Sequence, residues 1–225
     1  MRGLIPLVLA AWFAGAANAG TKALVFPEFD EADAHHAFVI AELRPGPHFP
    51  RDPDCDRPGV LCMDGPPFVL EAVVRSQLSG GPLPREMSLA TTSHYGNSKY
   101  AEDHGPYLVR VLTDGRDYIM PRYAAAKLVE DRLGRWHLIL HREELPWWLP
   151  CSTIGLKREF GEGDFAPAKV VIPDEALEDF GVPAHPELFR LTPGGAMPRY
   201  SIPMDALREH LAALPADSSL DCESD

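Results

Sequence analysis

The chain has 225 residues, of which 33 are acidic and 21 are basic, so its formal net charge at pH 7 is −12. A chain this acidic repels phosphate backbones, which argues against nucleic acid as a partner. The length suits one domain with a sizeable core, and the 23 prolines and 18 glycines favour many turns over long helices.

Residues 1–19 have the three parts of a cleavable secretory signal peptide. Arg2 is the only charged residue before Lys22, residues 4–17 are almost wholly apolar, and Ala17-Asn18-Ala19 places small residues where a signal peptidase reads them. The apolar run is shorter than the roughly 20 residues that a membrane span needs, and no later stretch is long enough. We therefore expect a soluble mature protein with no membrane span, either periplasmic or secreted.

The four cysteines follow the predicted cleavage point, and an even number in an exported chain indicates disulfides. Among the three possible pairings we favour Cys55–Cys62, which closes a short turn, and Cys151–Cys222, which ties down a polar tail. In the chain-entropy model the longer loop would contribute about 3–4 kcal/mol. Cys55 and Cys62 are too far apart for the C-x-x-C motif of a redox enzyme or a zinc site.

We expect residues 20–61 to form an irregular N-terminal extension. Residues 37–43 read either as the end of a helix or as a strand, and the pair Val39-Ile40 favours the strand. Residues 45–58 hold five prolines, which predicts an extended loop.

Residues 62–151 carry the clearest β pattern and are the predicted barrel domain. About five strands with hairpin links predict a mainly β fold, built as a small antiparallel OB-like barrel or a strongly coiled sheet. Residues 123–130 could instead form a short helix. The expected strands are residues 68–78, 85–95, 107–113, 117–120, 123–130 and 135–142, with a hairpin turn at Asp114-Gly115.

Residues 152–225 are expected to be a C-terminal extension with one or two short helices and a disordered acidic tail. Residues 174–180 predict a short helix, and residues 203–214 a better one. Four residues of the second helix form an apolar stripe that we expect to pack against the barrel. They are Met204, Leu207, Leu211 and Leu214.

The layout resembles the secreted OB-fold barrels of the netrin-like, TIMP-like kind. The likeness is carried by Cys62 ahead of the first barrel strand, the strand at 68–78, the hairpin at Asp114-Gly115 and Cys151 after the last strand. The Cys-x-Cys start of that family is absent, so its protease inhibition does not carry over to this chain.

The polar loop after residue 95 is a candidate binding site, because long loops on a β scaffold tend to hold ligand contacts. Its ligand-binding candidates are His94, Tyr95 and Tyr100, and His94, Asp103 and His104 could hold a divalent metal if the loop folds back. An ordinary solvated loop is the alternative.

His137 and His141 share one face of a strand, where four residues separate them by about 13 Å. One metal ion cannot bridge that distance, so two histidines on a solvated sheet face are the expected arrangement.

Trp147 and Trp148 are adjacent and are flanked by Pro146 and Pro150. We favour burial of both rings in a hinge between the barrel and the C-terminal region. In the alternative, one ring plugs the barrel end and the other is exposed as a ligand-binding or sugar-stacking site.

The chain has no G-x-S-x-G elbow, P-loop or G-x-G-x-x-G motif. Our leading hypothesis is a non-enzymatic exported protein that binds a protein or a small ligand and needs no cofactor. The alternative is a metal-dependent hydrolase or metal-binding protein using His94, His104 and nearby acids. A structural component of the cell envelope is a third possibility.

Overall fold

The computed structural model shows a mainly β fold, as the sequence predicts. None of the helices in the described part of the chain has the length and hydrophobicity needed to cross a membrane. The predicted signal peptide lies outside the described residues. The structure describes residues 24–28, 34–57, 65–94, 96–102, 105–140, 145–161 and 163–214.

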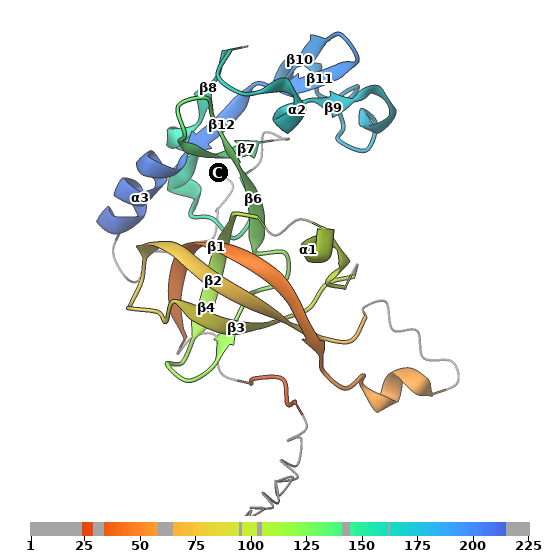
Figure 1. Cartoon of the computed structure of the whole chain (residues 1–225), viewed down its shortest axis with the longest axis vertical. Coiled ribbons are helices and arrows are strands. Elements are labelled where there is room, and N and C mark those ends of the chain that lie inside the picture. The colour runs from red at the N-terminus through yellow and green to blue at the C-terminus, as the bar shows by residue number, and fades with distance from the viewer. Residues whose placement is uncertain are drawn as a thin grey trace, which may run out of the picture.

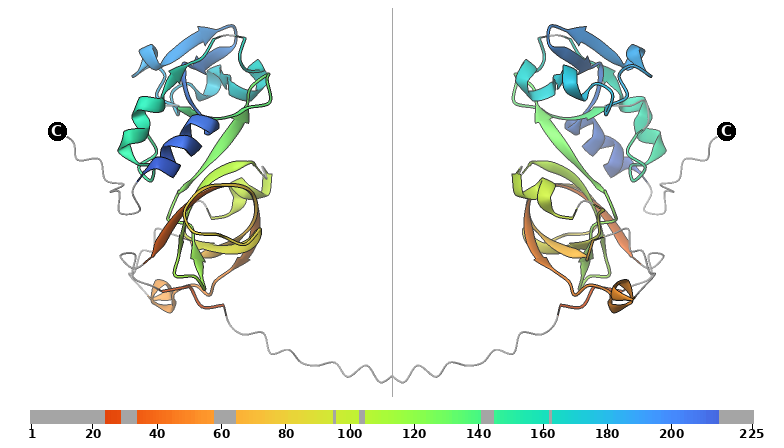
Figure 2. Two further views of the ribbon diagram at one scale, coloured as in Figure 1. Left: turned by 90° about the vertical axis from the view of Figure 1, so that its left-hand side faces the viewer. Right: turned by 90° about the vertical axis from the view of Figure 1, so that its right-hand side faces the viewer.

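A closed five-stranded barrel forms the centre of the described structure. The strands follow one another in the order β1-β2-β3-β5-β4, and β4 pairs back onto β1 to close the ring, which is visible in the turned views of Figure 2. The spatial order β4-β1-β2-β3 is that of a Greek key, and a five-stranded Greek-key barrel is the OB-like architecture. The strands are β1 (His35–His48), β2 (Phe68–Ser79), β3 (Glu86–Thr91), β4 (Tyr107–Thr113) and β5 (Tyr118–Ile119).

β1 closes the barrel although it lies in the range expected to be an irregular extension. Residues 35–41 of this strand pair with β4 on one side, and residues 38–48 pair with β2 on the other. Register shifts after Phe38 and Ile40 act as bulges that bend the strand between these partners. Pro45 is tolerated because it lies near the strand's end, where the pairing with β2 is shifted again. The strand interpretation of residues 37–43 is therefore confirmed.

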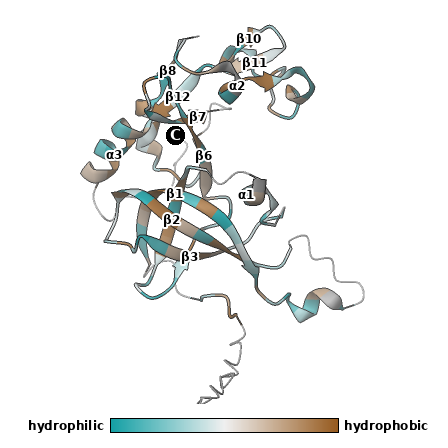
Figure 3. Cartoon of the chain, in the orientation of Figure 1, coloured by the Kyte–Doolittle hydropathy of each residue, from teal (hydrophilic) through white to brown (hydrophobic). Residues whose placement is uncertain are grey.

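The barrel interior is filled by side chains that alternate along its strands. Phe68, Leu70, Leu89 and Leu108 are fully buried, and Figure 3 shows hydrophobic and hydrophilic residues alternating along β1 and β2. Short helix α1 (Ser98–Glu102), in the loop between β3 and β4, adds Tyr100 to the same core.

Four further strands extend the sheet beyond the barrel and form an upper part joined to it by β6 (Figure 1). β6 pairs with β4, and from β6 the order continues through β7 and β12 to β8. Helix α3 packs its buried stripe of Met204, Leu207 and Leu211 into the hydrophobic core that the barrel shares with β7 and β12. The prediction that this stripe contacts the barrel is confirmed. The elements are β6 (Ala125–Glu130), β7 (Trp136–Leu140), β8 (Arg158–Glu159), β12 (Tyr200–Pro203) and α3 (Met204–Ala213).

The C-terminal extension contains more strand than the sequence pattern predicts. A small three-stranded sheet covers the far end of the molecule in Figure 1, and the helix expected over residues 174–180 is a single 3-10 turn followed by other turns. These strands are too short for their periodicity to be read. They are β9 (Ile172–Pro173), β10 (Phe189–Thr192) and β11 (Gly195–Pro198); the short helices are α2 (Pro167–Val170), η1 (Pro53–Asp56), η2 (Cys151–Leu156), η3 (Asp174–Ala176) and η4 (Pro186–Leu188).

Candidate functional site

A cleft of about 780 Å³ opens beside the barrel where the ends of β3, β4 and β5 meet the segment before β1 and the link after β7. This volume lies in the range of small-molecule sites, about 300–1,000 Å³. Most of the lining residues are apolar. The apolar lining residues include Phe26, Ile119, Met120 and Trp147. The polar ones include Thr91 and Arg122. We call it the Trp147 cleft.

The two adjacent tryptophans divide their roles between the core and this cleft. Trp148 is 2% exposed and stacks on Phe38 of β1, whereas Trp147 is 59% exposed and lines the cleft. The favoured interpretation, that both rings are buried, is therefore wrong. The two neighbouring rings lie in a turn, and only Trp148 reaches the core.

Arg122 brings a positive charge to the cleft and lies beside a strained backbone position. Its guanidinium carbon stands 5.1 Å from the centroid of the Tyr123 ring. Tyr123 has a positive φ of 61°, which is rare for a bulky residue and requires support from its surroundings. Part of that support is the hydrogen bond that the His94 backbone amide donates to the Tyr123 hydroxyl, at 3.2 Å.

The same contacts act on the pKa of Tyr123. Partial loss of water would raise this pKa, but the hydrogen bond from the His94 amide and the neighbouring Arg122 guanidinium outweigh it and lower the pKa below its usual value. Arg122 therefore lines the cleft from a turn whose next residue, Tyr123, is held by these contacts.

Thr91 ends β3 at the wall of the cleft and is 1% exposed. Its Oγ1 atom is buried and makes no hydrogen bond. A buried hydroxyl without a partner is costly, and such groups are uncommon in folded proteins. Thr91 thus brings an unpartnered hydroxyl to the wall of the cleft, although its Oγ1 is closed to solvent in this structure.

Of the residues predicted to form the loop site, the structure describes His94 and Tyr100, and the two differ in their surroundings. His94 is exposed, with its ring 6.3 Å from that of Tyr123. Tyr100 is a correction to the ligand-binding candidates: it is buried against Tyr107, and burial raises its pKa far above the usual value. Its large apolar ring is used to fill the barrel core. Tyr95, Asp103 and His104 lie outside the described residues.

The predicted metal set stays a prediction, because Asp103 and His104 fall outside the described ranges. Within those ranges, no group of three or more His, Cys, Asp or Glu side chains could hold a metal ion.

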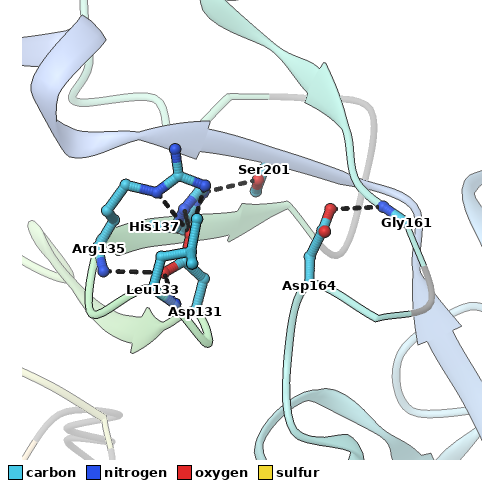
Figure 4. Close-up of polar contacts among 7 residues, drawn as sticks. All are labelled: Asp131, Leu133, Arg135, His137, Gly161, Asp164 and Ser201. Atoms are coloured by element: carbon cyan, nitrogen blue, oxygen red, sulfur yellow. Dashed lines mark hydrogen bonds and ion pairs between the residues drawn. The ribbon is translucent and has the colours of Figure 1, made fainter.

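A second cluster of polar groups joins the turn between β6 and β7 to β12 (Figure 4). The Asp131 carboxylate accepts hydrogen bonds from the backbone amides of Leu133 and Arg135, both at 2.9 Å. It also pairs with the Arg135 guanidinium, at 2.7 Å and 2.8 Å, and with His137 Nε2, at 3.1 Å. On the other side of the ring, His137 Nδ1 lies 3.1 Å from Ser201 Oγ.

These contacts lower the pKa of Asp131. Burial alone would raise it, but the hydrogen bonds from the Arg135 amide and guanidinium, the Leu133 amide and His137 bring the pKa down to about 2. Because the ionised carboxylate only accepts, His137 Nε2–H is the donor in its contact with Asp131.

The order Asp131–His137–Ser201 has the chemical types of a nucleophile relay, yet its surroundings are those of a structural network. Ser201 is 1% exposed in a strand paired on both sides, and Phe165 covers the His137 ring edge-on at 5.1 Å. A substrate cannot reach this hydroxyl. The network instead ties the β6–β7 hairpin to β12.

This network also corrects the expectation that His137 faces solvent. His137 is 7% exposed, because residues of the C-terminal region cover the second face of β7. His141 lies outside the described residues.

Cys55 and Cys151 are the two described cysteines, and neither is a free thiol. Cys62 and Cys222 lie outside the described residues, so the pairing of the four stays a prediction.

Comparison of the chain with protein-family models, with curated proteins and with solved structures gives no match. The class that the structure defines is thus architectural: a closed five-stranded barrel compatible with an OB-like barrel, with a cleft at its side.

Proposed function

We propose that the chain is an exported, disulfide-stabilised binding protein of the OB-like barrel class, which holds its ligand in the Trp147 cleft and performs no chemistry on it. The netrin-like, TIMP-like likeness enters this proposal only as a type of exported barrel scaffold. The observation that supports binding most is the cleft itself. It combines an exposed indole, a guanidinium and a buried hydroxyl without a partner on a closed barrel.

The cleft has the composition of a ligand site rather than of a reaction centre. Small-molecule sites are concave and mostly apolar, with a few polar groups that fix the ligand's orientation. The His, Asp and Ser groups that could transfer protons lie instead in the buried network around Asp131. Among the described lining residues of the cleft, Glu28 is the one carboxylate, and it is not part of that buried network.

Fragment screening by ligand-observed NMR tests the proposal on the purified mature protein. We expect fragments that bind the wild type to lose binding to the Trp147→Ala variant. Leu133→Ala is the matched control, because Leu133 is also a large exposed apolar residue but does not line the cleft. Hits that bind Trp147→Ala as tightly as the wild type would contradict the proposal.

A further inference from the structure

We infer that the Trp147 cleft binds a small monocarboxylic acid that carries an apolar ring. This inference rests on the proposed function, because it names the ligand class of the same site. The ring faces the apolar wall, and the carboxylate is held by Arg122 and the Thr91 hydroxyl.

The apolar wall favours a flat ring. Trp147 presents an exposed indole, and Phe26, Ile119 and Met120 line the same cleft. Aromatic rings pack well in offset-stacked or edge-to-face arrangements, which contribute about 0.5–1.5 kcal/mol beyond the burial of area. Since Phe26 packs edge-on against Phe49 at 5.3 Å, its ring is held in place before a ligand arrives.

The charge pattern favours a single carboxylate. Among the described lining residues, Arg122 is the one cation and Glu28 the one anion. The planar guanidinium matches a carboxylate through two parallel hydrogen bonds, and its position over the Tyr123 ring limits its orientation. Glu28 and the net charge of −12 oppose a ligand with several negative charges.

The Thr91 hydroxyl completes the polar end of the site. A carboxylate offers lone pairs beyond the two that a bidentate arginine occupies, and a hydroxyl can donate to one of them. Thr91 Oγ1 is buried without a partner, so a rotation of the side chain that turns it toward the carboxylate would break no existing hydrogen bond.

Isothermal titration calorimetry with three ligands of nearly equal shape tests this inference. The ligands are 1-naphthylacetate, its neutral amide 1-naphthylacetamide, and the cation 1-naphthylmethylammonium. We expect the wild type to bind the carboxylate at least about tenfold more tightly than the amide, as a charge-assisted pair implies, and the cation more weakly still. This preference should shrink as salt is added.

Two variants locate the preference in the cleft. Arg122→Gln should bind the carboxylate and the amide about equally, and Thr91→Val should reduce the preference in part. Arg132→Gln removes the same charge from an exposed arginine that does not line the cleft, so it should keep the wild-type ratio. Thermal melting of each variant confirms that it is folded.

The outcomes separate this inference from the proposed function. Equal binding of amide and carboxylate by the wild type, or an unchanged ratio in folded Arg122→Gln, overturns the ligand class but leaves the cleft as a binding site. Binding of none of the three ligands, while the NMR fragments still depend on Trp147, also overturns only the ligand class. The proposed function fails separately, when fragment binding is independent of Trp147.

Discussion

The indole of Trp148 stacks on the phenyl ring of Phe38, with the ring centroids 6.4 Å apart and the planes inclined by 23°. This contact joins the link after β7 to the strand that closes the barrel. It fixes the link from the inside, and so it presents the neighbouring Trp147 to the cleft on the outside.

Truncating the two tryptophans should therefore have opposite effects on stability and on binding. Trp148→Ala leaves a large cavity in the core and should lower the free energy of unfolding by about 3–5 kcal/mol. Trp147→Ala removes an exposed ring and should change it by less than about 1 kcal/mol. Urea unfolding measures both, and similar losses for the two variants would show that the rings are not divided between core and surface.

Asp131→Asn should destabilise the protein at neutral pH by about 1–3 kcal/mol, because it weakens the charge-assisted hydrogen bonds around the β6–β7 turn. The pKa of Asp131 is about 2 in the folded protein and about 3.8 as an ordinary value. Its stabilising effect is thus complete above about pH 4 and is lost as the pH falls toward 2. The difference between wild type and variant should shrink over that interval in denaturant titrations. A difference that stays constant from pH 6 to pH 3 would rule out this assignment.

Gly80 and Gly81 offer a matched test of the hairpin between β2 and β3. A Cβ on Gly80 would lie 2.5 Å from the carbonyl oxygen of His36, and the φ of 89° is unfavourable for other residues. Gly80→Ala should lower the free energy of unfolding by about 2–4 kcal/mol. A Cβ on Gly81 meets no atom within 4 Å, so Gly81→Ala should stay within about 1 kcal/mol of the wild type. Equal unfolding midpoints for the two variants would contradict the close approach of this turn to β1.

The sequence predicted those strands and helices whose own pattern of apolar residues marks the face that is buried. The apolar run at 107–113 is β4. The stripe of Met204, Leu207 and Leu211 lies on α3 and faces the hydrophobic core. Barrel closure by β1 was missed, because its pairing with β4 joins residues that are distant in sequence and its end is rich in proline. His137 was misjudged for a related reason, since its cover comes from the later residue Phe165.

The candidate site could be predicted only in part. The unusual pair Trp147-Trp148 is visible in the sequence, but which ring is exposed depends on the position of Phe38. Phe26, Thr91 and Arg122 carry no local signal, because the fold brings them together from separate segments. Even the positive φ of Tyr123 falls on a residue type that does not predict it.

Export makes a prediction about the covalent structure of the mature chain. N-terminal sequencing of protein recovered from the periplasm or medium should begin at Gly20, and non-reducing peptide mapping should give Cys55–Cys62 and Cys151–Cys222. Reduction should lower the free energy of unfolding by about 2–5 kcal/mol. A chain recovered with residues 1–19 intact, or with four free thiols, would contradict the exported state.

Metal analysis separates the binding protein from the metal-dependent alternative. If the Trp147 cleft is the functional site, chelation with EDTA should leave the affinity of the NMR fragments unchanged, because Glu28 is the one His, Cys, Asp or Glu among its described lining residues and a single carboxylate does not hold a metal ion. His94→Ala should also bind these fragments like the wild type, since His94 does not line the cleft. The measurements are elemental analysis of the purified protein and titration before and after chelation. Stoichiometric zinc or copper that is lost in His94→Ala, together with fragment binding that EDTA abolishes, would favour the metal-binding protein instead.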